Sequence, residues 1–121
     1  MVKTLNPESL FAGKIHALLA RTYLNRVKGR DYYDLLFFAS RDVKVNLKYL
    51  NSKLQDSGHI NKARVLKEKE LIELLKEKFS ETDFEKAKKD VKPFLKQNSL
   101  INVDDWNSEL FIAIAETIKI S

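Results

Sequence analysis

The feature that most constrains the fold is an apolar run, Leu35 to Ala39, that directly follows two carboxylates, Asp31 and Asp34. On a helix, apolar side chains in this run point in every direction, which predicts a central, buried helix over residues 30–40. A carboxylate on such a helix is costly unless a cation or a hydrogen-bond donor meets it. Asp31 falls in the first turn, where the helix dipole favours negative charge. Asp34 needs another partner.

A second amphipathic helix, expected over residues 7–22, can supply that partner. Asn6 precedes a proline and is a typical N-cap residue. At about 100° per residue, Lys14 and Arg21 lie within roughly 40° of Leu10, on the apolar side of this helix. We therefore expect Lys14 to point into the apolar side and the helix to pack against residues 30–40.

Two interpretations of this arrangement remain open from the residues alone. Lys14 and Asp34 can form a buried ion pair that braces two helices, because structural ion pairs are common in such positions. A lysine beside two carboxylates is also what the wall of a nucleotide cleft requires, where charge on phosphate oxygens must be stabilised.

The rest of the chain shows helical periodicity and few helix breakers, with only 3 Gly and 2 Pro. We expect an all-α fold, a single helical-bundle domain of five or six helices spanning residues 1–121. The remaining helices are expected at residues 45–56, at 61–79 with Asn61 as N-cap, after Ser80 or Thr82 and ending near Pro93, and from Asn102 or Asp104 onward.

Positive charge is concentrated in the first part of the chain. Residues 1–50 hold 9 Lys and Arg against 4 Asp and Glu, whereas residues 51–121 hold 13 of each. No acidic residue lies between Lys14 and Arg30. Such a patch attracts phosphates, so a nucleotide or a nucleic acid is a reasonable partner. The alternative is a basic loop that serves only solubility.

Several classes of function are disfavoured by what the sequence lacks. There is no Cys, which excludes thiolate chemistry, and with only 2 His the common zinc sites are disfavoured. No glycine-rich phosphate loop is present. The longest apolar runs are too short to cross a bilayer, and the start of the sequence has no signal-peptide pattern. We expect a cytoplasmic protein with no membrane partner.

The spacing of two segments within residues 8–38 resembles a known family. Residues 8–21 follow the pattern E-x-L-x-A-x-K-x-x-A-L-x-x-R, and residues 30–35 follow R-D-x-Y-D-L after a short basic loop. This pair of motifs resembles the AbiEii/AbiGii-type nucleotidyltransferase toxins of bacterial abortive-infection and toxin–antitoxin systems. The resemblance implies a fold like that of DNA polymerase β-type nucleotidyltransferases and magnesium-supported nucleotide transfer.

The resemblance also implies roles for individual residues. Lys14 would contact the nucleotide phosphates, together with Arg21 and Arg30, and Asp31 or Asp34 would act as the base or orient it. The implied partners are a nucleoside triphosphate, RNA as a candidate acceptor, and an antitoxin protein.

The sequence departs from the family at its metal-binding motif. The family has a Gly-Ser step followed by Asp-x-Asp or Asp-x-Glu on a strand, and this chain has no Gly-Ser step and no Asp-x-Asp. We therefore expect the C-terminal helical part of such a protein, without the N-terminal catalytic α/β lobe. Alone, it should bind no Mg²⁺ and should be inactive. The alternative is a non-enzymatic helical adaptor or antitoxin-like module that binds protein or nucleic acid through its basic N-terminal half.

Overall fold

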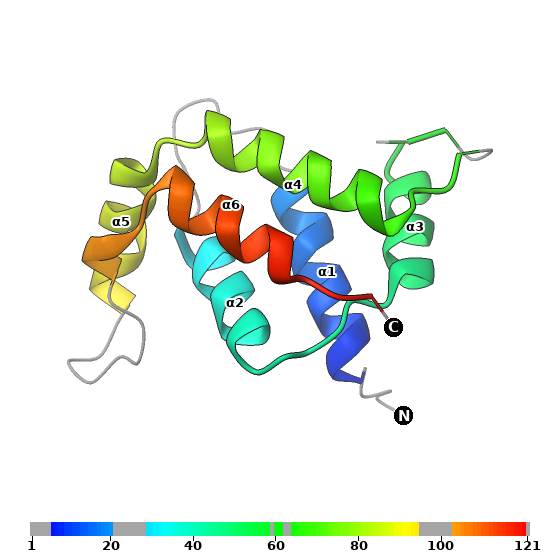
Figure 1. Ribbon diagram of the computed structural model, residues 1–121, viewed down its shortest axis with the longest axis horizontal. Helices are drawn as coiled ribbons and strands as arrows, with labels where there is room; N and C mark the ends of the chain where they lie inside the picture. Colours follow the sequence, from blue (N-terminus) through cyan, green and yellow to red (C-terminus); the bar gives the residue numbers. More distant parts are fainter. Residues whose placement is uncertain (1–5, 21–28, 59, 62–63, 95–102, 121) are drawn as a thin grey trace.

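The computed structural model describes residues 6–20, 29–58, 60–61, 64–94 and 103–120. Within these ranges the chain forms six α-helices and no β-strand, which confirms the expected all-α fold. The helices are α1 (Pro7–Ala20), α2 (Gly29–Ser40), α3 (Leu47–Asp56), α4 (Glu68–Glu81), α5 (Phe84–Val91) and α6 (Ser108–Thr117), with short 3₁₀ helices at Lys92–Phe94 and Val103–Asp105 (Figure 1).

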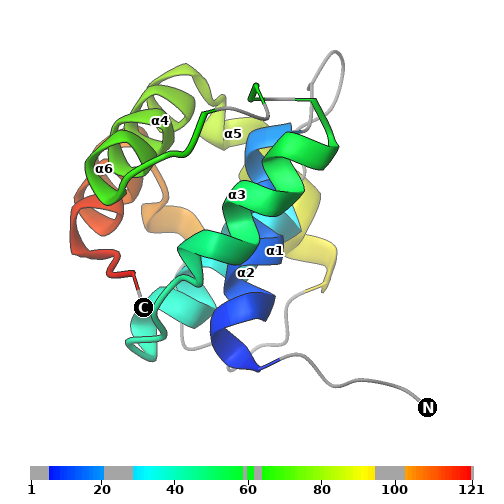
Figure 2. The ribbon, with the colours of Figure 1, turned by 90° about the vertical axis from the view of Figure 1, so that its right-hand side faces the viewer.

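The helices are arranged around α1 and α2. Helix α1 packs against α2, α3 and α4, and α2 extends these contacts to α5 and α6 (Figure 1). Helices α4 and α6 run side by side, and Figure 2 shows this pair to the left of α3 and α1. The packing of the first helix on the second, expected from their apolar faces, is confirmed.

The core is rich in aromatic side chains that come from five separate segments. Phe111 of α6 lies at its centre, fully buried, with ring-centroid distances of 4.7 Å to Phe84, 5.3 Å to Trp106, and 5.4 Å to both Tyr32 and Phe79. Edge-to-face and offset aromatic pairs add stabilisation beyond the area that they bury. The cluster therefore joins α2, α4, α5 and α6 into one core.

The first two helices begin where the sequence predicts. Asn6 caps α1, because its side-chain oxygen accepts a hydrogen bond of 2.8 Å from the backbone N–H of Ser9. Helix α2 spans Gly29–Ser40, but it is not buried on every side, since Phe37 is 40% exposed. The prediction that α2 is buried on every side is therefore wrong for the face that carries Phe37.

Two later helices begin further along the chain than predicted. Helix α3 starts at Leu47, capped by Asn46, and Val45 instead forms an isolated parallel β-bridge with Ile120. Helix α4 starts at Glu68, and Asn61 does not cap it. The cause is Asn51, whose side chain accepts from the N–H of Leu66 (2.7 Å) and donates to its carbonyl (3.1 Å), which holds that buried residue outside the helix.

The caps of the last two helices also differ from the prediction. Asp83 caps α5, because its carboxylate accepts from the N–H groups of Glu85 and Lys86. Asn107 caps α6 through a 2.7 Å hydrogen bond from the N–H of Leu110. Asp104, a predicted start, lies in a 3₁₀ helix, and the other predicted start, Asn102, lies outside the described residues.

Over the described part of the chain, none of the helices has both the length and the apolar character needed to cross a lipid bilayer.

Candidate functional site

Lys14 of α1 and Asp34 of α2 come together where these two helices pack. The ammonium Nζ of Lys14 lies 3.0 Å from a carboxylate oxygen of Asp34. Each residue lies within a regular helix, and the two helices pack against each other. The packing of α1 on α2 therefore fixes their positions, and no loop is involved. The ion pair between Lys14 and Asp34, one of the two arrangements considered from the sequence, is therefore formed.

The pair is open to solvent, which differs from the expectation that Lys14 points into the apolar side. The side chain of Lys14 is 44% exposed and that of Asp34 is 35% exposed. Lysine can lay its methylene groups along apolar surface while its ammonium reaches water, which explains how an apolar position on the helical wheel ends at the surface. The charges are thus available to a ligand, and they are not sealed into the core.

The neighbouring turn of each helix carries an aromatic side chain. The rings of Phe11 and Phe38 stack with centroids 5.3 Å apart, next to the Lys14–Asp34 pair. Phe11 comes before Lys14 on α1, whereas its partner Phe38 comes after Asp34 on α2. The two helices therefore run antiparallel at this contact. We use the name α1–α2 seam for the Lys14–Asp34 pair together with the exposed residues about one turn away on the same two helices, Leu10, Arg30 and Phe37.

The other predicted site residues are placed differently. Asp31 lies in the first turn of α2 and is only 8% exposed, one turn before Asp34. The helix dipole favours a carboxylate at this position, as expected. Arg30 is exposed at the start of the same helix. Arg21 lies outside the described residues, so its predicted contact with phosphate stays a prediction.

The start of α2 is fixed by α5, a feature that sequence reasoning missed. The backbone N–H of Gly29 donates to a carboxylate oxygen of Asp90 at 2.8 Å, which satisfies one of the free N–H groups at the helix start. A Cβ atom on Gly29 would collide with the carbonyl oxygen of Ala87. Gly29 is itself the signal of a close approach, but nothing in the local sequence points to a partner 61 residues away.

Tyr32 belongs to the same motif but serves the core. Its ring is fully buried, and its hydroxyl forms a 2.7 Å hydrogen bond with the hydroxyl of Thr82. A buried phenol needs such a partner. The motif thus divides its residues between two tasks, because Tyr32 and Leu35 anchor α2 in the core while Asp34 faces the surface.

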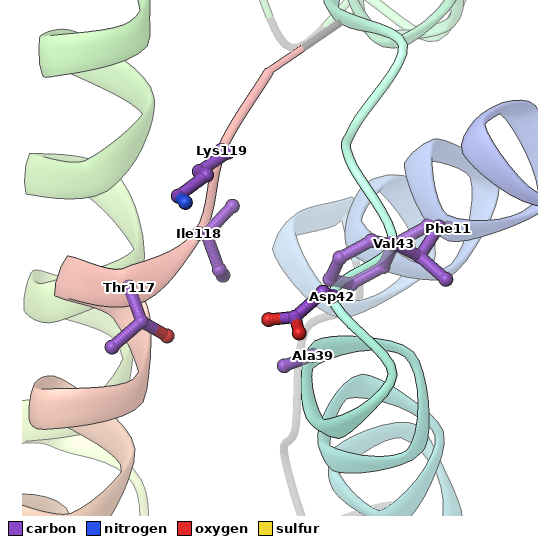
Figure 3. A pocket seen from close by; sticks show the side chains of 7 residues that line it. All are labelled: Phe11, Ala39, Asp42, Val43, Thr117, Ile118 and Lys119. Atoms are coloured by element: carbon purple, nitrogen blue, oxygen red, sulfur yellow. The ribbon is translucent and has the colours of Figure 1, made fainter.

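Two hollows in the described surface are unsuited to a nucleotide. The first has a volume of about 20 Å³ and lies between α6 and the end of α2, with Phe11, Asp42 and Lys119 among its lining residues (Figure 3). Its size suits a single water molecule. The second, of about 340 Å³, is shallow and is lined by Glu70, Glu73 and Glu77 beside Arg64 and Lys69, a carboxylate excess that repels phosphates. Neither hollow includes a predicted site residue.

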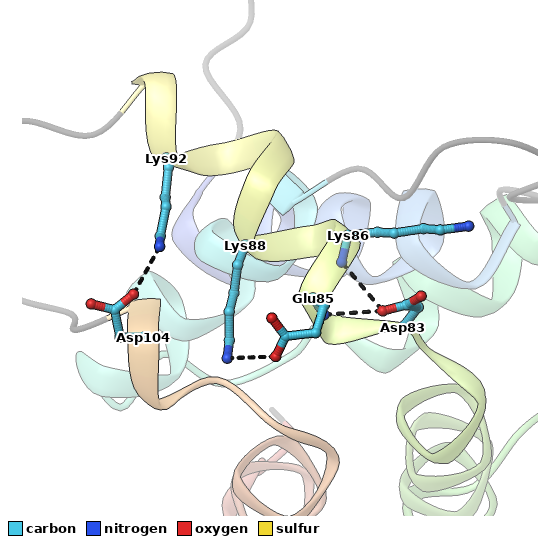
Figure 4. Close-up of polar contacts among 6 residues, drawn as sticks. All are labelled: Asp83, Glu85, Lys86, Lys88, Lys92 and Asp104. Atoms are coloured by element: carbon cyan, nitrogen blue, oxygen red, sulfur yellow. Dashed lines mark hydrogen bonds and ion pairs between the residues drawn. The ribbon is translucent and has the colours of Figure 1, made fainter.

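The acidic residues in the described part of the chain do not form a metal site. Among the described residues, no three His, Cys, Asp or Glu side chains are grouped so that they could hold a metal ion. Asp83 and Glu85 belong to an Asp-x-Glu tripeptide, but Asp83 lies at the start of α5 and Glu85 pairs with Lys88 (Figure 4). The Lys88 ammonium is 3.0 Å from the Glu85 carboxylate. They stabilise a helix terminus. Asp31 and Asp34 are also a poor fit for Mg²⁺, since one is buried and the other is paired with Lys14.

Comparison with known proteins identifies a family. The family model described as nucleotidyl transferase AbiEii toxin, type IV TA system, matches residues 1–109 of the 121. No curated protein and no solved structure matches the chain. The match covers most of the chain, including both motifs and the helices that carry them. The chain therefore belongs to the AbiEii family of nucleotidyl transferase toxins of type IV toxin–antitoxin systems.

Proposed function

We propose that this chain is the helical part of a nucleotidyltransferase and that its α1–α2 seam contacts the nucleotide. The observation that carries the proposal is the exposed ion pair of Lys14 and Asp34, 3.0 Å apart on two packed helices. A solvent-exposed pair of this kind contributes little to stability. It can open to exchange one charge partner for another when a phosphate approaches.

Lys14 would contact the nucleotide phosphates, with Arg30 and Arg21 as further cations. Negative charge on the transferring phosphoryl group must be stabilised, and fixed cations on rigid helices do this without reorganisation. Released from Lys14, Asp34 would accept a proton from the acceptor or orient it. Asp31 would act with it or hold α2 in position.

Magnesium would be held mainly by residues outside the described part of this chain. A nucleotidyl transfer site commonly uses Mg²⁺ to neutralise charge on the phosphates. Because Asp31 and Asp34 do not group with a third ligand among the described residues, we place the metal ligands on a separate α/β lobe that faces the seam. Residues 1–121 then form a single helical domain, which completes the site only together with that lobe.

The substrates follow from the family and from the charge. A nucleoside triphosphate suits the basic first part of the chain, and we propose RNA as the acceptor and an antitoxin protein as the regulatory partner. The alternative, an adaptor without enzymatic function, differs in one respect: its basic surface would work without Lys14 and Asp34 taking part in transfer.

A transfer assay tests the proposal. The 121-residue chain is incubated with labelled nucleoside triphosphates, Mg²⁺ and RNA, with and without an α/β lobe from another member of the family that carries the metal motif. We expect no transfer by the chain alone and transfer when the lobe is present. Lys14→Met should reduce the rate by about 100-fold or more, the typical loss of one charge-stabilising contact.

Lys92→Met is the matched control. Lys92 is also exposed and also ion-paired, 2.9 Å from Asp104, but it lies beyond the end of α5 (Figure 4). We expect this variant to retain the parent rate. Robust Mg²⁺-dependent transfer by the isolated chain, abolished by Asp34→Ala, would contradict the two-lobe proposal. Equal rates for Lys14→Met and Lys92→Met would contradict the assignment of the site to the seam.

A further inference from the structure

The α1–α2 seam exposes apolar side chains as well as charges. Three large hydrophobic residues are well exposed among those described, Leu10 at 41%, Phe37 at 40% and Val65 at 61%. Leu10 and Phe37 both belong to the seam, one turn from Lys14 and from Asp34 respectively. Because α1 and α2 are antiparallel, these two apolar residues lie toward the same end of the seam.

Phe37 is held in place by two neighbours, although 40% of the residue stays exposed. The guanidinium of Arg41 lies 4.3 Å from the centre of its ring. The ring of Phe38 meets it edge-on, with centroids 5.6 Å apart, and Phe38 in turn stacks on the fully buried Phe11. The Phe37 ring is thus held by a series of ring contacts that leads through Phe38 to the buried Phe11. Little side-chain freedom would therefore be lost when a ligand packs on it.

We propose that Phe37 and Arg41 form a stacking platform for the base of the nucleotide, an inference that rests on the proposed function of the seam. Aromatic rings and guanidinium planes are the two side-chain surfaces on which nucleobases stack. The two are already arranged against each other here, as in cation–π pairs. The platform would accept any base, because every base offers a π face.

The position of the platform suits a single nucleotide. Phe37 lies three residues after Asp34 on α2, about 5 Å along the helix axis. Asp34 contacts Lys14, the proposed phosphate ligand. The ribose of a nucleotide bridges a comparable separation between its base and its phosphates.

Calorimetric titration of the full chain separates the base from the phosphates. The ligands are ATP, GTP and inorganic tripolyphosphate, which has the charge without the base. Phe37→Leu keeps apolar contact with Phe38 but removes the ring. We expect it to weaken ATP and GTP binding by about 5- to 150-fold, the range for stacking one base on an aromatic side chain. Its affinity for tripolyphosphate should stay within about two-fold of the parent.

Two variants keep the outcomes distinct. Tyr49→Leu is the matched control, because Tyr49 also has a cation over its ring, the ammonium of Lys53 at 5.5 Å, but lies on α3. It should bind all three ligands like the parent. Lys14→Met should weaken all three. Parent-like binding of ATP and GTP by Phe37→Leu would overturn the platform. Parent-like binding by Lys14→Met would instead overturn the phosphate contact of the proposed function, and no binding by the parent would overturn both.

Discussion

At the scale of single residues, the central finding is that two opposite charges meet on a packed helix pair without being buried. Lys14 and Asp34 are 44% and 35% exposed, so neither carries a large desolvation cost. A sealed pair at the same place would be indispensable to the fold, because removing one partner would leave an unpaired buried charge. Exposure therefore argues against a sealed structural brace, and a ligand contact at this pair stays a prediction.

Denaturant unfolding tests this distinction. Lys14→Met and Asp34→Asn should each change the free energy of unfolding by no more than about 1.5 kcal/mol, because exposed ion pairs contribute little. Lys92→Met serves as the reference for losing an exposed lysine pair elsewhere. A loss of about 3–5 kcal/mol from either seam variant would show that the pair braces the helices.

The sequence predicted the partners at this scale but not their exposure. Helical periodicity predicted that Lys14 can pair with Asp34. It also predicted that Asp31 lies in the first turn of its helix. How far a lysine side chain extends to water depends on its neighbours in three dimensions. Asp90 at the start of α2 could not be predicted, because it comes from a helix distant in sequence.

At the scale of the elements, the close approach of α2 to α5 positions the site. Gly29 allows α2 to meet Ala87 and Val91 at backbone distance. This contact and the Asp90 hydrogen bond determine where α2 begins, and so where Asp31 and Asp34 lie along it. Asp90 thus supports the site without being part of it.

Two glycine substitutions test the role of this contact. Gly29→Ala should destabilise the protein by about 1–3 kcal/mol or more, because the added methyl group overpacks the junction. Gly13→Ala is the control, since no atom lies within 4 Å of its added Cβ and the residue is inside α1. It should stabilise by about 0.5–1 kcal/mol through helix propensity. Thermal unfolding measures both, and equal effects would show that the junction is loose.

Helix boundaries were predictable only where local sequence determines them. The Asn6 cap follows from neighbouring residues and was predicted, and α2 begins within one residue of its predicted start although its contact with Asp90 was not predicted. The start of α4 was wrong because it depends on Asn51, which binds the backbone of Leu66 from another helix. The periodicity of apolar residues predicted a helix that includes Leu66. The side chain of Leu66 is buried in the core, but its backbone lies outside the helix.

At the scale of the whole molecule, charge and core occupy different parts of the chain. The net positive charge arises from residues 1–50, which include the seam, whereas later residues supply most of the aromatic core. The family match ends at residue 109, yet Phe111 is the centre of that core. The later helices thus act as the support on which α1 and α2 present their charges.

An NMR titration that locates the phosphate-binding surface on the folded chain tests the role of the seam most directly. In an NMR titration of the ¹⁵N-labelled protein with tripolyphosphate, we expect the largest amide shifts around Lys14 of α1 and Asp34 of α2, and a loss of these shifts in Lys14→Met. Helix α5 is the internal comparison, because Lys86 and Lys89 are exposed lysines away from the seam. Shifts that are largest on α5, or that are equal at all basic surfaces, would contradict the claim that the α1–α2 seam is the nucleotide-contact site.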